Sequence, residues 1–300
     1  MTQKNLSLLA LLIFLGLTTN AKAQLFDGFT PQKGSLSLTA SFTYSEFDKI
    51  YAGSEEVDLA GVEGVTQHIY SIYAKYGISD KVSAVINLPY ITSNTDTGVD
   101  PYNGESSLSD FQDLGLAIKV NAYKFKFKTS NLNLITGLGI NIPLGYEPNG
   151  IITIGNNAWG VDYSAGLHLN TDIGFFSTIF ANYSLREDSK SSANNINSDF
   201  KVPNYFSTHG KIGYSSSFIY AEVWATYLNS DEGPDIGGEG FLSTGNFPEV
   251  DVESSSFGVT LYKNITPKLG LSLGYSNIFD GRNTTPASTY SGGLTFNLSK

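Results

Sequence analysis

Residues 34–44 read GSLSLTASFTY, and from residue 36 onward their side chains alternate strictly in character. Leucine, alanine and aromatic residues take the even positions, and serine and threonine take the odd positions. Successive side chains of a β-strand point to opposite faces, so this stretch has one apolar and one hydroxylated face. A soluble sandwich would bury the apolar face in protein, whereas a membrane barrel would turn it toward lipid and the hydroxyl groups toward a lumen.

The N-terminus carries the pattern of an exported protein. A lysine precedes an apolar run over residues 6–17, and an Ala-Lys-Ala sequence follows at residues 21–23. This order is typical of a secretory signal peptide, and the run is shorter than the about 20 residues of a transmembrane helix. We therefore expect residues 1–23 to be cleaved, residues 24–33 to form a short periplasmic segment and residues 34–300 to form one domain.

The composition excludes several classes of protein. The chain of 300 residues has no cysteine, so disulfides and thiolate metal sites are excluded. Its net charge of -10 argues against nucleic acid or an anionic membrane face as a partner. No stretch after the leader is long and apolar enough for a transmembrane helix.

Alternating segments separated by turn signals recur along the chain, without a convincing helical period, and this predicts an all-β fold. Short and long connections alternate between these segments, which is typical of a single antiparallel up-and-down transmembrane barrel. A Greek-key sandwich has no reason to keep that alternation. The twelve predicted strands cover residues 34–47, 65–76, 81–92, 111–123, 131–146, 158–170, 175–186, 204–215, 218–229, 253–262, 268–278 and 289–298.

The apolar parity leads to an aromatic residue near the long-loop end of nine predicted strands. Tyrosine and tryptophan are enriched where a barrel wall meets the lipid headgroups, so these residues predict an aromatic girdle. We therefore expect a barrel in the outer membrane of a Gram-negative bacterium, with its leucines toward the lipid and its serines toward a lumen. The girdle residues are Tyr44, Tyr70, Tyr90, Tyr146, Trp159, Tyr183, Tyr227, Tyr275 and Tyr290.

The inward parity is mostly small or polar, and a twelve-stranded barrel lined in this way could hold a narrow pore. The alternative is a lumen plugged by the long loops or by residues 24–33. Charged and histidine side chains are few on this parity and are the candidates for solute selectivity. They are Lys75, Asp113, Lys119, His168, Arg186, His209, Lys211 and Glu222.

A tight hairpin at residues 216–217 would place Lys211 opposite Glu222 and His209 opposite Trp224. The Lys-Glu pair can be a selectivity element, or an ion pair that satisfies two charges facing a confined lumen, and we favour the second interpretation. The two inward histidines lack a metal-ligand spacing and are expected to be solvated lumen residues.

His68 differs from the other histidines because its parity places it outward, near the loop end of its strand. Outer-membrane phospholipases carry a catalytic histidine on the lipid-facing wall, but their His-x-Ser-Asn-Gly type of signature is missing around residues 66–70. An interfacial histidine beside the girdle is the favoured interpretation. The acidic loop segments 96–113 and 231–235 could bind Ca²⁺ weakly, although solvated loop charge is the default interpretation.

Four segments resemble one family of outer-membrane transporters, named after the meta-pathway of phenol degradation. They are YGISDKV at residues 76–82, NLPY at 87–90, FQDLGLAIK at 111–119 and IPLGY at 142–146. The family's Gly-Leu-Gly run is replaced here by the Phe-Gln pair that opens the third segment. The resemblance implies a porin-like β-barrel and uptake of small compounds, often aromatic or hydrophobic. These motifs are turns and strand edges, so they bear on fold more than on substrate.

The sequence therefore predicts an outer-membrane channel or transporter for diffusion of small, weakly charged solutes, including aromatic or hydrophobic ones. It predicts no cofactor, no metal site and no chemical step. The barrel-assembly machinery is the expected partner during biogenesis, and the sequence does not set the oligomeric state. Two other functions remain open: a non-conducting structural or adhesive barrel, and a lipid-modifying barrel enzyme.

Overall fold

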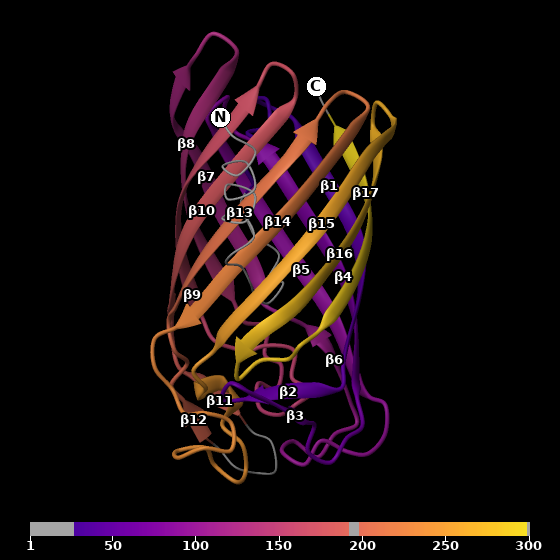
Figure 1. Cartoon of the computed structure of the whole chain (residues 1–300), viewed down its shortest axis with the longest axis vertical. Coiled ribbons are helices and arrows are strands. Elements are labelled where there is room, and N and C mark those ends of the chain that lie inside the picture. Colours follow the sequence, from indigo (N-terminus) through magenta and orange to yellow (C-terminus); the bar gives the residue numbers. More distant parts are fainter. Residues whose placement is uncertain (1–26, 192–197, 299–300) are drawn as a thin grey trace, which may run out of the picture.

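The computed structural model describes residues 27–191 and 198–298, which form a closed antiparallel β-barrel of 12 strands (Figure 1). The predicted fold class is therefore confirmed. The barrel strands are β1 (Leu36–Phe47), β4 (Val65–Gly77), β5 (Val82–Thr95), β7 (Leu114–Lys126), β8 (Ser130–Ile142), β9 (Gly160–Thr171), β10 (Phe175–Arg186), β13 (Tyr205–Ser215), β14 (Ile219–Ser230), β15 (Glu253–Thr266), β16 (Leu269–Arg282) and β17 (Ser288–Leu298).

Each barrel strand pairs with its neighbours in the sequence, and β1 closes the sheet by pairing with both β17 and β4. The stretch quoted above lies in β1, where Leu36 pairs with Leu298 and Tyr44 pairs with Tyr290. Its hydroxyl side chains also meet across the seam, because Thr39 Oγ1 lies 2.9 Å from Thr295 Oγ1. Closure leaves no free edge in the ring of 12 described barrel strands, which a lipid environment requires.

The two ends of the barrel differ in the length of their connections. Short turns join β7 to β8, β9 to β10, β13 to β14 and β15 to β16 at the upper end in Figure 1. The lower end carries the long loops with β2 (Lys49–Ala52), β3 (Glu55–Asp58), β6 (Ser107–Phe111), β11 (Ser189–Ser191), β12 (Ser198–Phe200) and the 3-10 helix η2 (Phe247–Glu249). Within the described ranges, no helix is long and apolar enough to cross a membrane.

Several strand limits differ from the predicted ones for local reasons. The predicted strand over residues 131–146 ends at Ile142, because Pro143 follows and offers no N–H to a ladder. A register shift between Asn121 and Tyr123 reverses the parity at the end of β7. Tyr123 is consequently 57% exposed on the outer wall, together with the aromatic side chains that follow it at alternate positions.

The outer wall is apolar between two aromatic zones. Leu138, Ile179 and Leu273 are among its large apolar side chains and are each more than half exposed. The sequence reasoning identified an aromatic zone near the long loops and missed a second one near the short turns. This second zone comprises Tyr76, Tyr123, Phe125, Phe127, Phe175, Tyr214, Phe218 and Phe296. Two such zones separated by an exposed apolar wall match the two interfaces of a bilayer.

Two clusters of buried apolar residues bear on the path through the barrel. One cluster fills the mouth between the long loops and contains Phe47, Val65 and Ile152. The other lies inside the barrel and joins Val85, Ala117, Ile135 and Phe180, with Tyr73 packed against it. Each position in this second cluster points inward from a different strand, so part of the lumen is filled by side chains.

Candidate functional site in the barrel lumen

The eight lumen candidates divide into an inner group and a group near the mouth. Lys119 is 1% exposed, and His168, His209 and Lys211 are also buried. Lys75 and Glu222 join these residues through ion pairs, which are described below. Asp113 immediately precedes β7 and Arg186 ends β10, so both lie next to the long loops. Their role in solute selection stays a prediction.

Lys211 and Glu222 form an ion pair across the β13–β14 hairpin, with 3.1 Å between Lys211 Nζ and Glu222 Oε2. The predicted register is nevertheless wrong by two positions, because Lys211 pairs with Trp224 and Glu222 pairs with Gly213. The turn lies one residue later than expected. Ser216 closes it, since its Oγ accepts hydrogen bonds from the N–H groups of Phe218 and Ile219.

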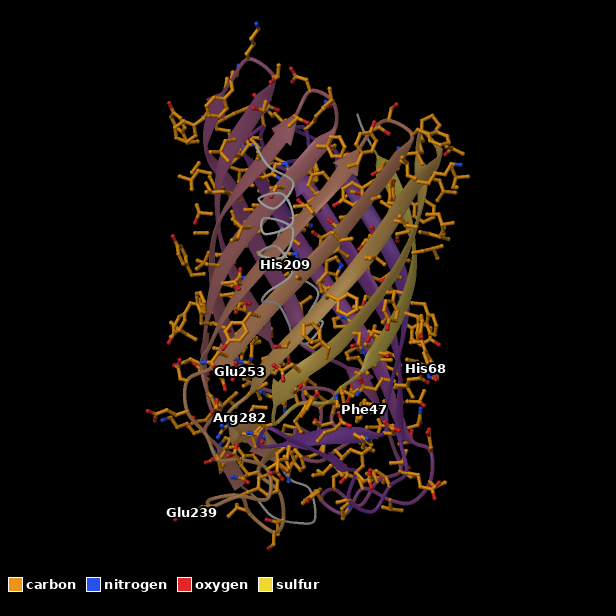
Figure 2. All side chains as sticks on the ribbon, in the orientation of Figure 1. Phe47, His68, His209, Glu239, Glu253 and Arg282 are labelled. Atoms are coloured by element: carbon orange, nitrogen blue, oxygen red, sulfur yellow. The ribbon has the colours of Figure 1, made fainter. Side chains whose placement is uncertain are left out.

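The two inward histidines are held by threonines and by aromatic rings. Nδ1 of His168 lies 2.8 Å from Thr178 Oγ1, and Nδ1 of His209 lies 2.7 Å from Thr226 Oγ1. His209 pairs with Thr226 in the register, yet its ring stacks on Trp224, with 5.8 Å between the ring centroids. Figure 2 shows His209 midway along the barrel. The expectation that both histidines are solvated is wrong, since both side chains are buried.

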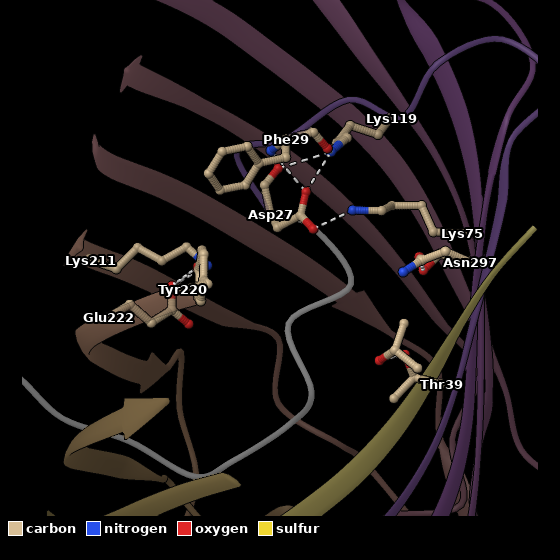
Figure 3. Close-up of polar contacts among 11 residues, drawn as sticks. Asp27, Phe29, Thr39, Lys75, Lys119, Lys211, Tyr220, Glu222 and Asn297 are labelled. Atoms are coloured by element: carbon tan, nitrogen blue, oxygen red, sulfur yellow. Dashed lines mark hydrogen bonds and ion pairs between the residues drawn. The ribbon is translucent and has the colours of Figure 1, made fainter. Parts of the chain in front are cut away.

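The segment before β1 folds back into the lumen, as Figure 3 shows. Asp27 forms ion pairs with Lys75 at 2.5 Å and with Lys119 at 2.8 Å. Lys119 Nζ also donates hydrogen bonds to the backbone carbonyls of Asp27 and Phe29. We call residues 27–30 the luminal tether. Residues 27–29 of the expected periplasmic segment thus lie inside the barrel, while its residues 24–26 and the expected cleavage site lie outside the described residues.

The tether fits the wall closely at Gly28. A Cβ atom at this position would clash with the ring of His168, so the backbone must approach the wall here without a side chain. Burial raises the pKa of Asp27, but the ammonium groups of Lys119 and Lys75 lower it by a larger amount. The pKa therefore lies well below its usual range. Asp27 is therefore ionised at neutral pH.

Near the mouth, Asp113 accepts a hydrogen bond of 2.7 Å from the phenol of Tyr146. Tyr146 was predicted as a girdle residue, and this is wrong because its side chain is 4% exposed and belongs to a loop folded over the mouth. Burial and the neighbouring Asp113 raise the pKa of the Tyr146 phenol above its usual range. Arg186 lies over the ring of Tyr205, 5.9 Å from its centroid. Its Nε and Nη2 atoms are buried without a hydrogen-bond partner among the described residues.

The long loops close the mouth around the buried carboxylate of Asp100. Asp100 Oδ2 accepts hydrogen bonds from the N–H groups of Ile151 at 2.6 Å and Ile152 at 3.0 Å. Asp100 Oδ1 accepts another from the N–H of Tyr102 at 2.9 Å. Burial, with Asp100 nearby, raises the pKa of the Tyr102 phenol. Nothing in the sequence pattern pointed to Asp100 as the residue that organises these loops.

The other predicted girdle residues lie on the outside of the barrel or at its rim. Tyr70, Trp159, Tyr183 and Tyr290 are exposed, while Tyr44, Tyr90, Tyr227 and Tyr275 are half-buried against neighbouring side chains. His68 is also on the outer wall, where Figure 2 labels it. Its ring centroid lies 5.8 Å from that of Phe42 and 5.7 Å from that of Tyr44.

Comparison with known proteins bears on family and fold. The model of the family described as "Putative MetA-pathway of phenol degradation" matches residues 39–294. No curated protein matches the chain. Among solved structures, an outer-membrane channel of Pseudomonas putida F1 superposes with a TM-score of 0.72 at 15% identity, covering 92% of this chain and 100% of that one.

Two further barrels superpose less closely. The NanC porin gives a TM-score of 0.47 at 10% identity, covering 88% of this chain and 100% of that one. CymD, a monoaromatic hydrocarbon channel, gives a TM-score of 0.43 at 10% identity, covering 95% of both chains. The first of the three structures supports the barrel fold described above.

Proposed function

The chain belongs to the family described as "Putative MetA-pathway of phenol degradation", and we propose that it is a passive outer-membrane channel for small, weakly charged solutes. Aromatic and other largely apolar compounds are the solute class that we favour. The family match supports this class through its name, and the wall of the lumen supports it through its chemistry.

The observation that carries this proposal is the division of the closed sheet into an apolar outer face and a hydroxyl-lined inner face. On β1, the inward residues 37, 39, 41, 43 and 45 are all serine or threonine, and they face a β17 that is equally polar on its inner side. A wall of this kind neither repels nor traps a neutral solute. A membrane protein that served as an anchor alone would have no need for a polar inner face.

Passage requires two closures to open, and a solute must also pass the inward side chains of Val85, Ile135 and Phe180. The mouth is covered by the loops around Asp100, and the lumen is occupied by the luminal tether. Neither closure is part of the barrel wall, so both can move while the sheet stays intact. We therefore expect brief openings of a narrow pore with a small mean conductance.

Single-channel recording in planar bilayers tests the proposal. The folded mature protein should give discrete openings, and a small aromatic acid such as benzoate should block them reversibly at millimolar concentration. The same preparation should show the heat-dependent gel mobility of a folded barrel. A folded barrel that never conducts would overturn the channel and favour a structural or adhesive role, which the packed mouth makes the second candidate.

A lipid-directed activity is the weakest alternative. His68 lies against the aromatic rings of Phe42 and Tyr44 on the outer wall, an environment that suits an interfacial side chain. We expect His68→Ala to leave phospholipid composition unchanged in vesicles that contain the protein. If the native protein turned over phospholipid and His68→Ala did not, His68 would be a catalytic residue and not only an interfacial side chain.

A further inference from the structure

The luminal tether presents two chemical groups to the barrel wall. Asp27 offers a carboxylate, and Phe29 offers an aromatic ring two residues later. Both side chains leave the same short stretch of backbone and enter neighbouring parts of the wall, as Figure 3 shows. Together they have the composition of an aromatic carboxylic acid.

The carboxylate part of the wall is built from lysines on separate strands. Lys75 on β4 and Lys119 on β7 contact the Asp27 carboxylate at 2.5 Å and 2.8 Å. The Lys119 side chain is 1% exposed, and a buried ammonium is costly unless an anion or several acceptors satisfy it. Because Lys211 is already paired with Glu222, removal of Asp27 would leave two lysines that require an anion.

The aromatic part of the wall comes from three other strands. The ring of Phe29 lies 4.6 Å from His168 on β9, 5.3 Å from Phe176 on β10 and 6.1 Å from Tyr220 on β14, measured between centroids. All three contacts are edge-to-face, which is a favourable geometry for aromatic rings. Tyr220 also donates a hydrogen bond to Glu222, which fixes the position of its ring.

We propose that this part of the lumen is a binding site for solutes that carry both an aromatic ring and a carboxylate, and that the luminal tether occupies it as an internal competitor. The inference rests on the proposed channel function and refines its solute class. An aromatic acid would place its carboxylate between Lys75 and Lys119 and its ring beside Phe176. Binding would then displace the tether, and the bound acid would itself occupy the inner closure until it leaves, as a reversible blocker does.

Equilibrium binding to the folded, detergent-solubilised mature protein tests this site. The probes are radiolabelled phenylacetate, its neutral analogue 2-phenylethanol, and acetate. Asp27→Asn removes the competing charge with little change in shape. We expect this variant to bind phenylacetate on the order of tenfold more tightly than the native protein, because the site is no longer occupied by its own carboxylate. The native protein should prefer phenylacetate to 2-phenylethanol and to acetate by a similar factor.

Variants of the wall complete the test. Lys119→Gln should abolish the preference for phenylacetate over 2-phenylethanol, whereas Lys124→Gln, an exposed lysine on the same strand, should leave it unchanged. The site is overturned if Asp27→Asn binds phenylacetate no more tightly than the native protein while remaining a heat-modifiable barrel. Equal affinity for phenylacetate and 2-phenylethanol would also overturn it.

The channel and the site can fail separately. Discrete conductance without phenylacetate binding would support the channel function and refute the proposed binding site. Phenylacetate binding without conductance, in both the native protein and Asp27→Asn, would support the binding site and refute the channel function.

Discussion

The two closures of the barrel rest on different forces. At the mouth, the loops pack Ile151 and Ile152 against Phe47, Val62 and Val65, all of them buried. In the lumen, the tether is held by the Asp27 carboxylate between two lysines, by two backbone carbonyls that accept from Lys119, and by the ring of Phe29. The first closure combines apolar burial with backbone N–H groups that donate to the Asp100 carboxylate, whereas the second depends mainly on ion pairs between charged side chains.

The difference indicates where a solute or a change of conditions can act. Apolar burial changes little with pH or salt, whereas an ion pair is lost when its acid is neutralised or when another anion replaces it. We infer that the mouth sets a constant resistance and that the inner closure is the one that responds to solutes. Changes made at one closure should therefore leave the other unchanged.

The largest effect is expected for Asp100→Ala at the mouth. This change leaves the N–H groups of Tyr102, Ile151 and Ile152 without their acceptor in a buried site. At about 1–3 kcal/mol for each group, local opening of the loops should become easier by roughly 3–9 kcal/mol. Amide hydrogen exchange of residues 149–154 measures this opening directly. Glu105→Ala, at an exposed position of the same loop, is the matched control and should change nothing.

Ile152→Ala should weaken the same closure by about 2–4 kcal/mol, because it leaves a cavity among fully buried neighbours. Val99→Ala removes apolar atoms from the side chain before Asp100, which is 51% exposed. This substitution should lower the free energy of loop opening far less. Exchange rates of the loop amides again provide the measurement. Equal effects of the two substitutions would show that apolar burial does not hold the mouth closed.

Acid should release the tether through Asp27. The pKa of this carboxyl is lowered when the tether is docked, so the resulting stability is complete above the free pKa of about 3.9 and is lost progressively as the pH falls from there toward the lower pKa of the docked state. Mean conductance should rise below about pH 4 in the native protein. Asp27→Asn should conduct more at neutral pH and lack this transition. The other titratable groups near Asp27 are Lys75, Lys119, Lys211, Tyr73, His168 and Tyr220.

Concentrated salt should have the smallest effect. Raising KCl from 0.1 M to 1 M shortens the screening length from about 10 Å to about 3 Å, and it supplies chloride to compete for the lysines. The tether should be loosened by about 1 kcal/mol or less, since Lys119 is nearly inaccessible. Loop exchange rates at the mouth should stay constant. If salt instead opened the mouth and left the tether docked, charge would hold the mouth and would not hold the tether, contrary to our account.

The barrel was predictable because its signal is local and repeated. Strict alternation in residues 36–44 and the spacing of the turns are enough to orient each strand in the bilayer. The predicted side-chain orientation or register failed where a single residue changes the inward–outward alternation of a strand or the position of a turn. The β-bulge after Asn121 turned Tyr123 outward, and Ser216 moved the β13–β14 turn by one residue.

The interior was harder to predict because its contacts join distant parts of the chain. Lys75 and Lys119 were recognised as inward from parity, but their partner Asp27 lies 48 and 92 residues away in the sequence. Asp100 gave no signal of this role, since two of its three hydrogen-bond donors are backbone N–H groups of another loop. Inward glycines suggested free space, yet the Trp224 ring covers Gly258 and the Phe176 ring covers Gly213.

The most direct test of the two closures is the accessibility of the tether to a thiol reagent, since the native chain has no cysteine. Thr30→Cys places one thiol on the docked tether, and Lys33→Cys places one at an exposed position just outside it. At neutral pH, a charged maleimide should label residue 30 far more slowly than residue 33, and Asp27→Asn should remove this difference. Equally fast labelling of both positions with Asp27 intact would contradict a tether held in the lumen by charge.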